Sequence, residues 1–316
     1  MASADGYRPR IRKNMGMKGA LPYMIGAAVS FALMGVCVKA SVAALPFLVA
    51  VLFRSLVSFV LLAGYFALTR TSVRAQQHGL LLLRSIFGFT ALILYFFALE
   101  HLPLSTAVVL NHSSPVFVVV LSALFLSEHR AALMIPLVIL AFFGASLLIA
   151  PDLSTVNVAA VLGLTSALFA AMAYLIVSRV SKTESSPTIV FYFTMYSTIF
   201  AFLVLGGAML LGLSDLRFPA LAQALTDPVQ LALLCGVGVA GTFGQLFMTA
   251  GYARERASVV SGFSYLTPVF SYLLGLWLFD EVPSASSLIG GAIIIAASVA
   301  ILMLSRPRVP PATGSE

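Results

Sequence analysis

The chain has 316 residues, of which 60% are hydrophobic and only 9% are charged, and its mean hydropathy is +1.05. Soluble domains are about 45–50% apolar and about 25% charged, so this composition excludes a soluble globular protein and indicates an integral membrane protein. The net charge of +7 does not indicate nucleic-acid binding, because the basic residues stand at the ends of apolar runs. Cys37 and Cys235 both fall within apolar runs, which predicts neither a disulfide framework nor a metal site.

Ten apolar runs, each close to the ~20 residues that cross about 30 Å of hydrocarbon, follow a basic N-terminal tail, residues 1–19. Because the alternating pattern of a transmembrane barrel is absent, we expect helices, which satisfy their own backbone hydrogen bonds. The first run lacks a small-residue cleavage site, so we expect it to remain as a helix. The predicted spans are 20–40, 46–68, 79–99, 103–126, 131–150, 157–179, 187–213, 229–252, 256–279 and 285–305, followed by an unstructured tail, 306–316.

The basic residues predict the orientation of these spans. Of the 18 Lys and Arg residues, Lys39 and Arg54 lie within spans, Arg217 falls on the side opposite the N-terminus, and the other fifteen fall on the N-terminal side. Cytoplasmic loops carry the excess of basic residues, so both termini are expected in the cytoplasm.

One motif occurs twice, 153 residues apart. Pro115 stands thirteen residues before Glu128, and Pro268 stands thirteen residues before Glu281. The same offset pairs Ser105 with Ser258, Gly88 with Gly241 and Leu121 with Leu274. Internal duplication therefore predicts two repeats, 20–150 and 157–305, of five spans each. An odd number of spans makes the repeats inverted, which is typical of transporters whose binding site lies at the bilayer midplane.

These residues and the duplicated ten-span pattern resemble the drug/metabolite transporter superfamily, specifically the EamA-type ten-helix permeases. The resemblance implies alternating access and basic residues at positions such as Lys39 and Arg54. The segment 264–269 is similar to that of aromatic amino-acid exporters. Leu83-Arg84, with Gly88, Ala98 and Pro103-Leu104 beyond, is instead similar to S-adenosylmethionine carriers and related organic-ion transporters. The two similarities disagree about the substrate.

Three basic residues are candidates for substrate binding. Arg54 is predicted about 12 Å deep in its span, at ~1.5 Å per residue. A charge at the centre of a membrane helix costs at least ~2.5 kcal/mol, which favours a functional role for Arg54 in attracting a carboxylate or phosphate. The alternative is an arginine that snorkels along its helix, and for Lys39 we favour that alternative. Arg84 is expected near the cytoplasmic interface, where it could also contact substrate.

The residues before the two prolines are further candidates. Proline removes a backbone hydrogen bond and kinks a helix, so both repeats are expected to expose polar main-chain groups near the midplane. We expect the substrate there; the alternative is that these side chains only bind neighbouring helices. His112 either carries protons or is a neutral residue in a helix contact. The candidates around the kinks are Asn111, His112, Ser114, Pro115, Ser264, Tyr265 and Pro268.

Other polar side chains complete the predicted site. Tyr95 and Gln245 supply hydrogen-bonding groups, and Tyr192, Phe193 and Tyr196 give the seventh span a wet or stacking face. Every Asp and Glu falls at a span end or in a loop, which argues against a buried-carboxylate proton relay. Glu128 and Glu281 are expected to act in gating or structure.

We therefore predict a secondary transporter of a small polar metabolite in the bacterial inner membrane, most simply an exporter of amino acids or related organic ions. Uptake or exchange, of an S-adenosylmethionine-type compound or an organic anion, is the alternative. An intramembrane enzyme would need a metal pair, a carboxylate cluster or an HExxH motif, and the sequence shows none of these. A channel would favour a polar stripe along several spans, which the sequence also lacks. No catalytic residue, cofactor or metal is predicted. The expected partners are the small-molecule substrate and the lipid bilayer, with the protein acting as a monomer or homodimer.

Overall fold

The computed structural model describes residues 19–41, 45–101, 110–125, 131–149, 158–212, 225–279 and 285–304. Every regular element within these ranges is helical, which confirms the all-helical prediction for the described residues. Seven of their helical stretches are long and apolar enough to cross a membrane, and three shorter apolar helices span Ser114–Phe125, Leu133–Leu147 and Leu288–Ile301. The elements are α1 (Leu21–Ser41), α2 (Phe47–Thr69), α3 (His78–His101), α5 (Ser114–Phe125), α6 (Ala131–Ile149), α7 (Val158–Val180), α8 (Ser186–Leu210), α10 (Pro228–Tyr252), α11 (Ala257–Phe263), α12 (Leu266–Phe279) and α13 (Ala285–Leu304).

Several helix ends follow from the residues that stand there. The Ser185 hydroxyl accepts a hydrogen bond from the Thr188 amide at 3.3 Å, which caps the first turn of α8. Asp227 caps α10 in the same way, accepting from the Val229 amide at 2.9 Å. Arg70 ends α2 in the left-handed conformation, with φ of 52°.

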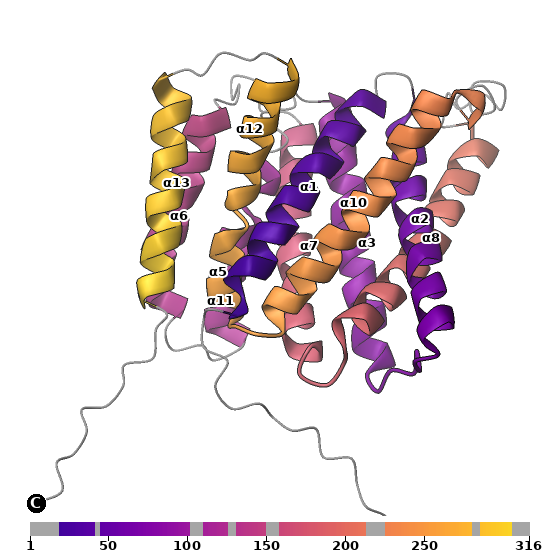
Figure 1. The fold of residues 1–316 in the computed structure, drawn as a ribbon, viewed down its shortest axis with the longest axis horizontal. Helices are drawn as coiled ribbons and strands as arrows, with labels where there is room; N and C mark the ends of the chain where they lie inside the picture. Colours follow the sequence, from indigo (N-terminus) through magenta and orange to yellow (C-terminus); the bar gives the residue numbers. More distant parts are fainter. Residues whose placement is uncertain are drawn as a thin grey trace, which may run out of the picture.

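The helices form two layers (Figure 1). One layer contains α13, α11 with α12, α1 and α10, and the other contains α6, α5, α7 and α3. Helices α6 and α13 pack together at one end of the molecule, and α2 packs against α8 at the other. The most extensive helix contacts join α1 to α10 and α3 to α7.

Glycines allow two helix pairs, α6 with α13 and α2 with α10, to approach closely. A Cβ atom added to Gly144 on α6 would lie 2.9 Å from the carbonyl oxygen of Gly290 on α13. One added to Gly238 on α10 would lie 3.1 Å from the carbonyl oxygen of Phe53 on α2 and would collide with Val57. Small residues at such contacts promote helix packing in lipid, where no hydrophobic effect drives helices together.

The helix is interrupted just before each of the two prolines that the duplicated motif contains. A turn at Ser264 and Tyr265 separates α11 from α12, and a turn at His112 and Ser113 precedes α5. Pro268 has no amide hydrogen for the Ser264 carbonyl, which accepts instead from the Thr267 amide at 3.1 Å. The local hydrogen bonding therefore changes where the proline removes a donor.

Candidate functional site

Two arginines lie buried inside the helix bundle. Arg54 on α2 is 6% exposed and Arg84 on α3 is 2% exposed. We refer to them as the arginine pair. A guanidinium stays protonated in proteins, so each side chain brings a positive charge into the bundle. Buried charges are costly unless they are paired, and within membrane spans they are a common mark of substrate and ion pathways.

Phe193 on α8 lies beside both members of the pair. The guanidinium carbon of Arg84 is 3.5 Å from the centroid of the Phe193 ring, and that of Arg54 is 5.9 Å from the same centroid. The two guanidinium carbons are therefore at most about 9.4 Å apart. At that separation two cations repel by roughly 2 kcal/mol at an effective dielectric constant of about 20. The ring offers a cation–π contact, which eases this repulsion without neutralising either charge.

Gln245 on α10 supplies a neutral partner for Arg84. Its Oε1 atom accepts a hydrogen bond from Arg84 Nη2 at 3.1 Å. Arg84 Nε and Nη1 and Arg54 Nε are buried and have no hydrogen-bond partner. Buried donors are nearly always paired in native proteins, so three unpaired guanidinium nitrogens at one location indicate a place that accepts a ligand or water.

No carboxylate neutralises the arginine pair within the described part of the chain. Glu184 lies beyond the end of α7 and accepts hydrogen bonds from the backbone amides of Gln76, at 2.5 Å, and Gln77, at 3.0 Å. Asp227 caps α10, and Glu255 follows the end of that helix and accepts from the Arg256 amide. The described carboxylates are thus engaged at helix ends, away from the pair.

Two glycines from the repeated pattern lie against the arginine side chains. A Cβ atom on Gly88 would lie 2.9 Å from Phe193 Cε2 and 3.3 Å from Arg84 Nη1. One on Gly241 would lie 3.5 Å from Arg54 Cγ. Gly88 and Gly241 are separated by 153 residues, the offset of the duplicated motif.

The turns before the two prolines meet inside the bundle. The rings of His112 and Tyr265 lie with centroids 6.4 Å apart and planes inclined by 35°. Tyr265 is fully buried, and its hydroxyl has no hydrogen-bond partner. Asn111 Nδ2 donates to the Ser166 hydroxyl on α7 at 3.3 Å, so this amide binds a neighbouring helix.

Comparison with known proteins identifies the family of this chain. The EamA-like transporter family matches residues 18–150 and 157–303, which is most of the sequence. The chain belongs to the EamA-like transporter family. This confirms the resemblance to the drug/metabolite transporter superfamily that the duplicated motif carried.

Relatives of this EamA-family protein carry different cargoes. The pseudopaline exporter of Pseudomonas aeruginosa strain UCBPP-PA14 is 33% identical, over 90% of this chain and 96% of its own length. The riboflavin transporter of Vibrio cholerae is 29% identical, over 90% of this chain and 92% of its own length. The S-adenosylmethionine uptake transporter of Rickettsia felis is 24% identical, over 78% of this chain and 79% of its own length. A solved crystal structure with 16% identity superposes with a TM-score of 0.75, covering 91% of this chain and 98% of that one, and it supports the fold.

The EamA-family fold brings some predicted site residues together and separates others. Arg54, Arg84 and Gln245 gather at Phe193, whereas Tyr95 lies eleven residues beyond Arg84 on α3, about 16 Å along the helix. Ser114 is buried at the start of α5, and Ser264 is partly buried in the turn before α12. Glu128, Glu281 and the side chain of Lys39 lie outside the described residues.

Phe193 is the central site residue that the sequence did not single out. Its presence in an aromatic run with Tyr192 and Tyr196 predicted only a stacking face. Ser197 stands four residues after Phe193 on α8, and Thr249 stands four residues after Gln245 on α10, so each lies one turn further along the same helix face. The hydroxyl groups of Ser197 and Thr249 are buried and have no hydrogen-bond partner. Only the packing of α8 against α2 and α3 reveals the role of Phe193.

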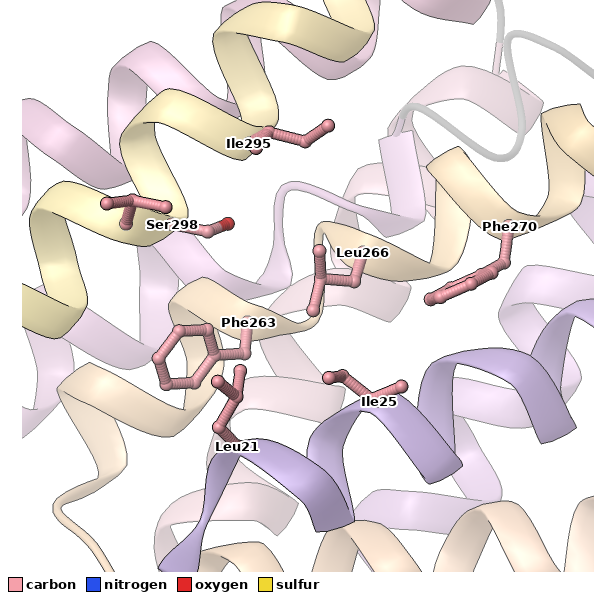
Figure 2. Close-up of a pocket in the computed structure, with 8 residues that line it drawn as sticks. Leu21, Ile25, Phe263, Leu266, Phe270, Ile295 and Ser298 are labelled. Atoms are coloured by element: carbon pink, nitrogen blue, oxygen red, sulfur yellow. The ribbon is translucent and has the colours of Figure 1, made fainter. Parts of the chain in front are cut away.

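A separate apolar cavity of about 190 Å³ opens between α1, α12 and α13 (Figure 2). Leu21, Ile25, Phe263 and Leu266 line it beside the break between α11 and α12. Ser298 is its one polar lining residue, and no charged side chain reaches it. It therefore lacks the polar groups that orient a hydrophilic ligand, and we place the candidate site at the arginine pair.

Proposed function

We propose that this EamA-family protein is a secondary active transporter that moves a small polar metabolite by alternating access. We further propose that it exports amino acids or related organic ions across the bacterial inner membrane. The relative that is 33% identical is named an exporter, which supports this direction. Two relatives of lower identity are named a riboflavin transporter and an S-adenosylmethionine uptake transporter, which keeps uptake or exchange as the alternative.

The proposed architecture has ten spans in two inverted repeats, 20–150 and 157–305, with both termini in the cytoplasm. Helix packing supports it. The 153-residue shift relates α3 to α10, and the order of helices in the proposed repeats relates α1 to α7, so the contact of α1 with α10 has its counterpart in the contact of α7 with α3. The shift also relates α6 to α13, and the order of helices in the proposed repeats relates α2 to α8. The members of each of these pairs contact each other.

The residues around the arginine pair come from both proposed repeats, and this observation supports the functional proposal most strongly. Arg54 and Arg84 come from the first proposed repeat, whereas Phe193 and Gln245 come from the second. A ligand bound here would touch both halves, as alternating access at a midplane site requires. The turns that contain His112 and Tyr265 supply polar groups from both repeats as well.

Counterflow in proteoliposomes tests this function. Vesicles containing the purified protein are loaded with one unlabelled compound from a panel of amino acids, organic acids and organic cations, and entry of a labelled compound is followed. We expect particular loaded compounds to accelerate entry, because a carrier returns faster when it is loaded. If no compound accelerates entry through protein shown to be folded, the transporter mechanism proposed here is wrong.

Cysteine accessibility tests the location of the site. Single cysteines placed beside Pro115 and Pro268 are treated with a membrane-impermeant thiol reagent, in a background without Cys37 and Cys235. We expect labelling that changes when substrate is present, since the turns there are proposed to line the pathway. Absence of labelling from either side would move the site away from these turns.

A further inference from the structure

We propose that the transported substrate is an organic anion with two carboxylate groups, one for each member of the arginine pair. This inference rests on the proposed transport function and names its substrate class. It follows from the charge and geometry around Phe193.

The site holds two buried positive charges that a bound substrate must balance. Arg54 and Arg84 are buried to more than nine-tenths, and both are permanently charged. No described carboxylate forms an ion pair with either residue, and Gln245 and Phe193 are neutral. A substrate with a single carboxylate would leave one buried cation without an anionic partner. A substrate with two carboxylates would balance both.

The second step is the supply of hydrogen-bond donors. Arg84 retains two unpaired nitrogens, Nε and Nη1, and Arg54 retains Nε. Guanidinium groups match carboxylates better than other side chains do, because their donors are planar and fixed in direction. The donors are enclosed in the described conformation, so the substrate reaches them when the helices from the two proposed halves move apart.

The third step is the spacing. Because both guanidinium carbons lie within 5.9 Å of one ring centroid, the pair is compact. A substrate that contacts both arginines at once therefore needs a short spacer between its carboxylates. Phe193 gives that spacer an apolar surface, since the ring is 3% exposed and lies near both cations.

Matched compounds that differ in one charge test this inference. Glutamate is compared with glutamine, and succinate with succinamate, in the counterflow assay and in thermal-unfolding scans of the detergent-purified protein. We expect at least one dicarboxylate to accelerate counterflow tenfold more than its amide partner, and to raise the unfolding temperature where the amide does not. Equal effects of the two members of both pairs would overturn the inference.

Arginine variants assign the effect to the site. Arg54→Gln and Arg84→Gln are each expected to abolish the preference for the dicarboxylate, while Arg54→Lys and Arg84→Lys retain part of it because the charge remains. Arg254→Gln is the matched control, because Arg254 stacks on Tyr23 at 3.9 Å and is not part of the pair. If the glutamine variants fold and keep the full preference, the arginine pair does not bind the carboxylates.

The outcomes distinguish the two proposals. Counterflow driven only by compounds with fewer than two carboxylates would overturn the dicarboxylate inference and leave the transport function standing. No counterflow with any compound of the panel would overturn the transport function itself. Dicarboxylate-dependent thermal stabilisation without counterflow would support the binding site and contradict its role in transport.

Discussion

His112 and Tyr265 occupy equivalent positions in the duplicated sequence, 153 residues apart, and their rings lie side by side with centroids 6.4 Å apart. Two equivalent residues can meet only close to the axis that relates the proposed repeats to which they belong. The turns before Pro115 and Pro268 therefore approach each other where the proposed halves join. Movement of one turn is therefore expected to displace the other.

Replacing the prolines tests the importance of the two turns. Alanine supplies the backbone amide hydrogen that proline lacks, so Pro115→Ala and Pro268→Ala are expected to let the helix continue through the turns. We expect counterflow turnover to fall by about tenfold, which corresponds to ~1.4 kcal/mol in the barrier. Pro136→Ala is the control, since Pro136 lies exposed within α6. Turnover that falls equally in the control would exclude a special role for the turns.

A carboxylate beside Arg84 should stabilise the protein and impair substrate binding. Gln245 Oε1 already accepts from Arg84 Nη2 at 3.1 Å, so Gln245→Glu would convert a neutral hydrogen bond into a charge-assisted one. Hydrogen bonds to charged groups contribute about 1.5–3 kcal/mol. We expect a higher unfolding temperature together with a raised KM for counterflow. Gln245→Leu should lower the unfolding temperature, and a Glu variant less stable than wild type would contradict this account.

The Phe193 ring should matter through its contact with the arginine pair. Phe193→Leu removes the cation–π contacts, which are worth roughly 0.5–2 kcal/mol, and is expected to lower both the unfolding temperature and substrate affinity. Phe191→Leu is the matched control on α8, because Phe191 packs against Phe59 and Phe66 instead. We expect the control to lose stability with unchanged affinity. Equal loss of affinity in both variants would show that the effect is general packing.

Gly88 should tolerate no side chain, in contrast to Gly79 on the same helix. In Gly88→Ala the new methyl group would press on Phe193 and Arg84, and overpacking of this kind typically costs about 1–3 kcal/mol. A Cβ atom on Gly79 meets nothing within 4 Å, so Gly79→Ala is expected to be neutral or to stabilise α3. Thermal unfolding in detergent measures both. A neutral Gly88→Ala variant would mean that Phe193 can move aside, and that its contact with Arg84 is loose.

The sequence alone determined the parts of this protein that depend on local pattern. Apolar runs long enough to cross a bilayer predicted the membrane helices, because the backbone in lipid must satisfy its own hydrogen bonds within each segment. The duplicated Pro115 and Pro268 motif indicated the EamA family and the position of the helix interruptions, since proline removes a specific backbone donor. Arg54 drew attention as a charge within a span.

The tertiary structure alone decided which of these residues meet. Arg84 and Gln245 are 161 residues apart in the chain, and their hydrogen bond depends on how α3 and α10 pack. Packing also placed Phe193 beside two arginines and turned Asn111 towards Ser166, a neighbour on another helix. Helices in lipid associate through shape and polar contacts that no single segment contains, which is why the arginine pair became visible only in the folded bundle.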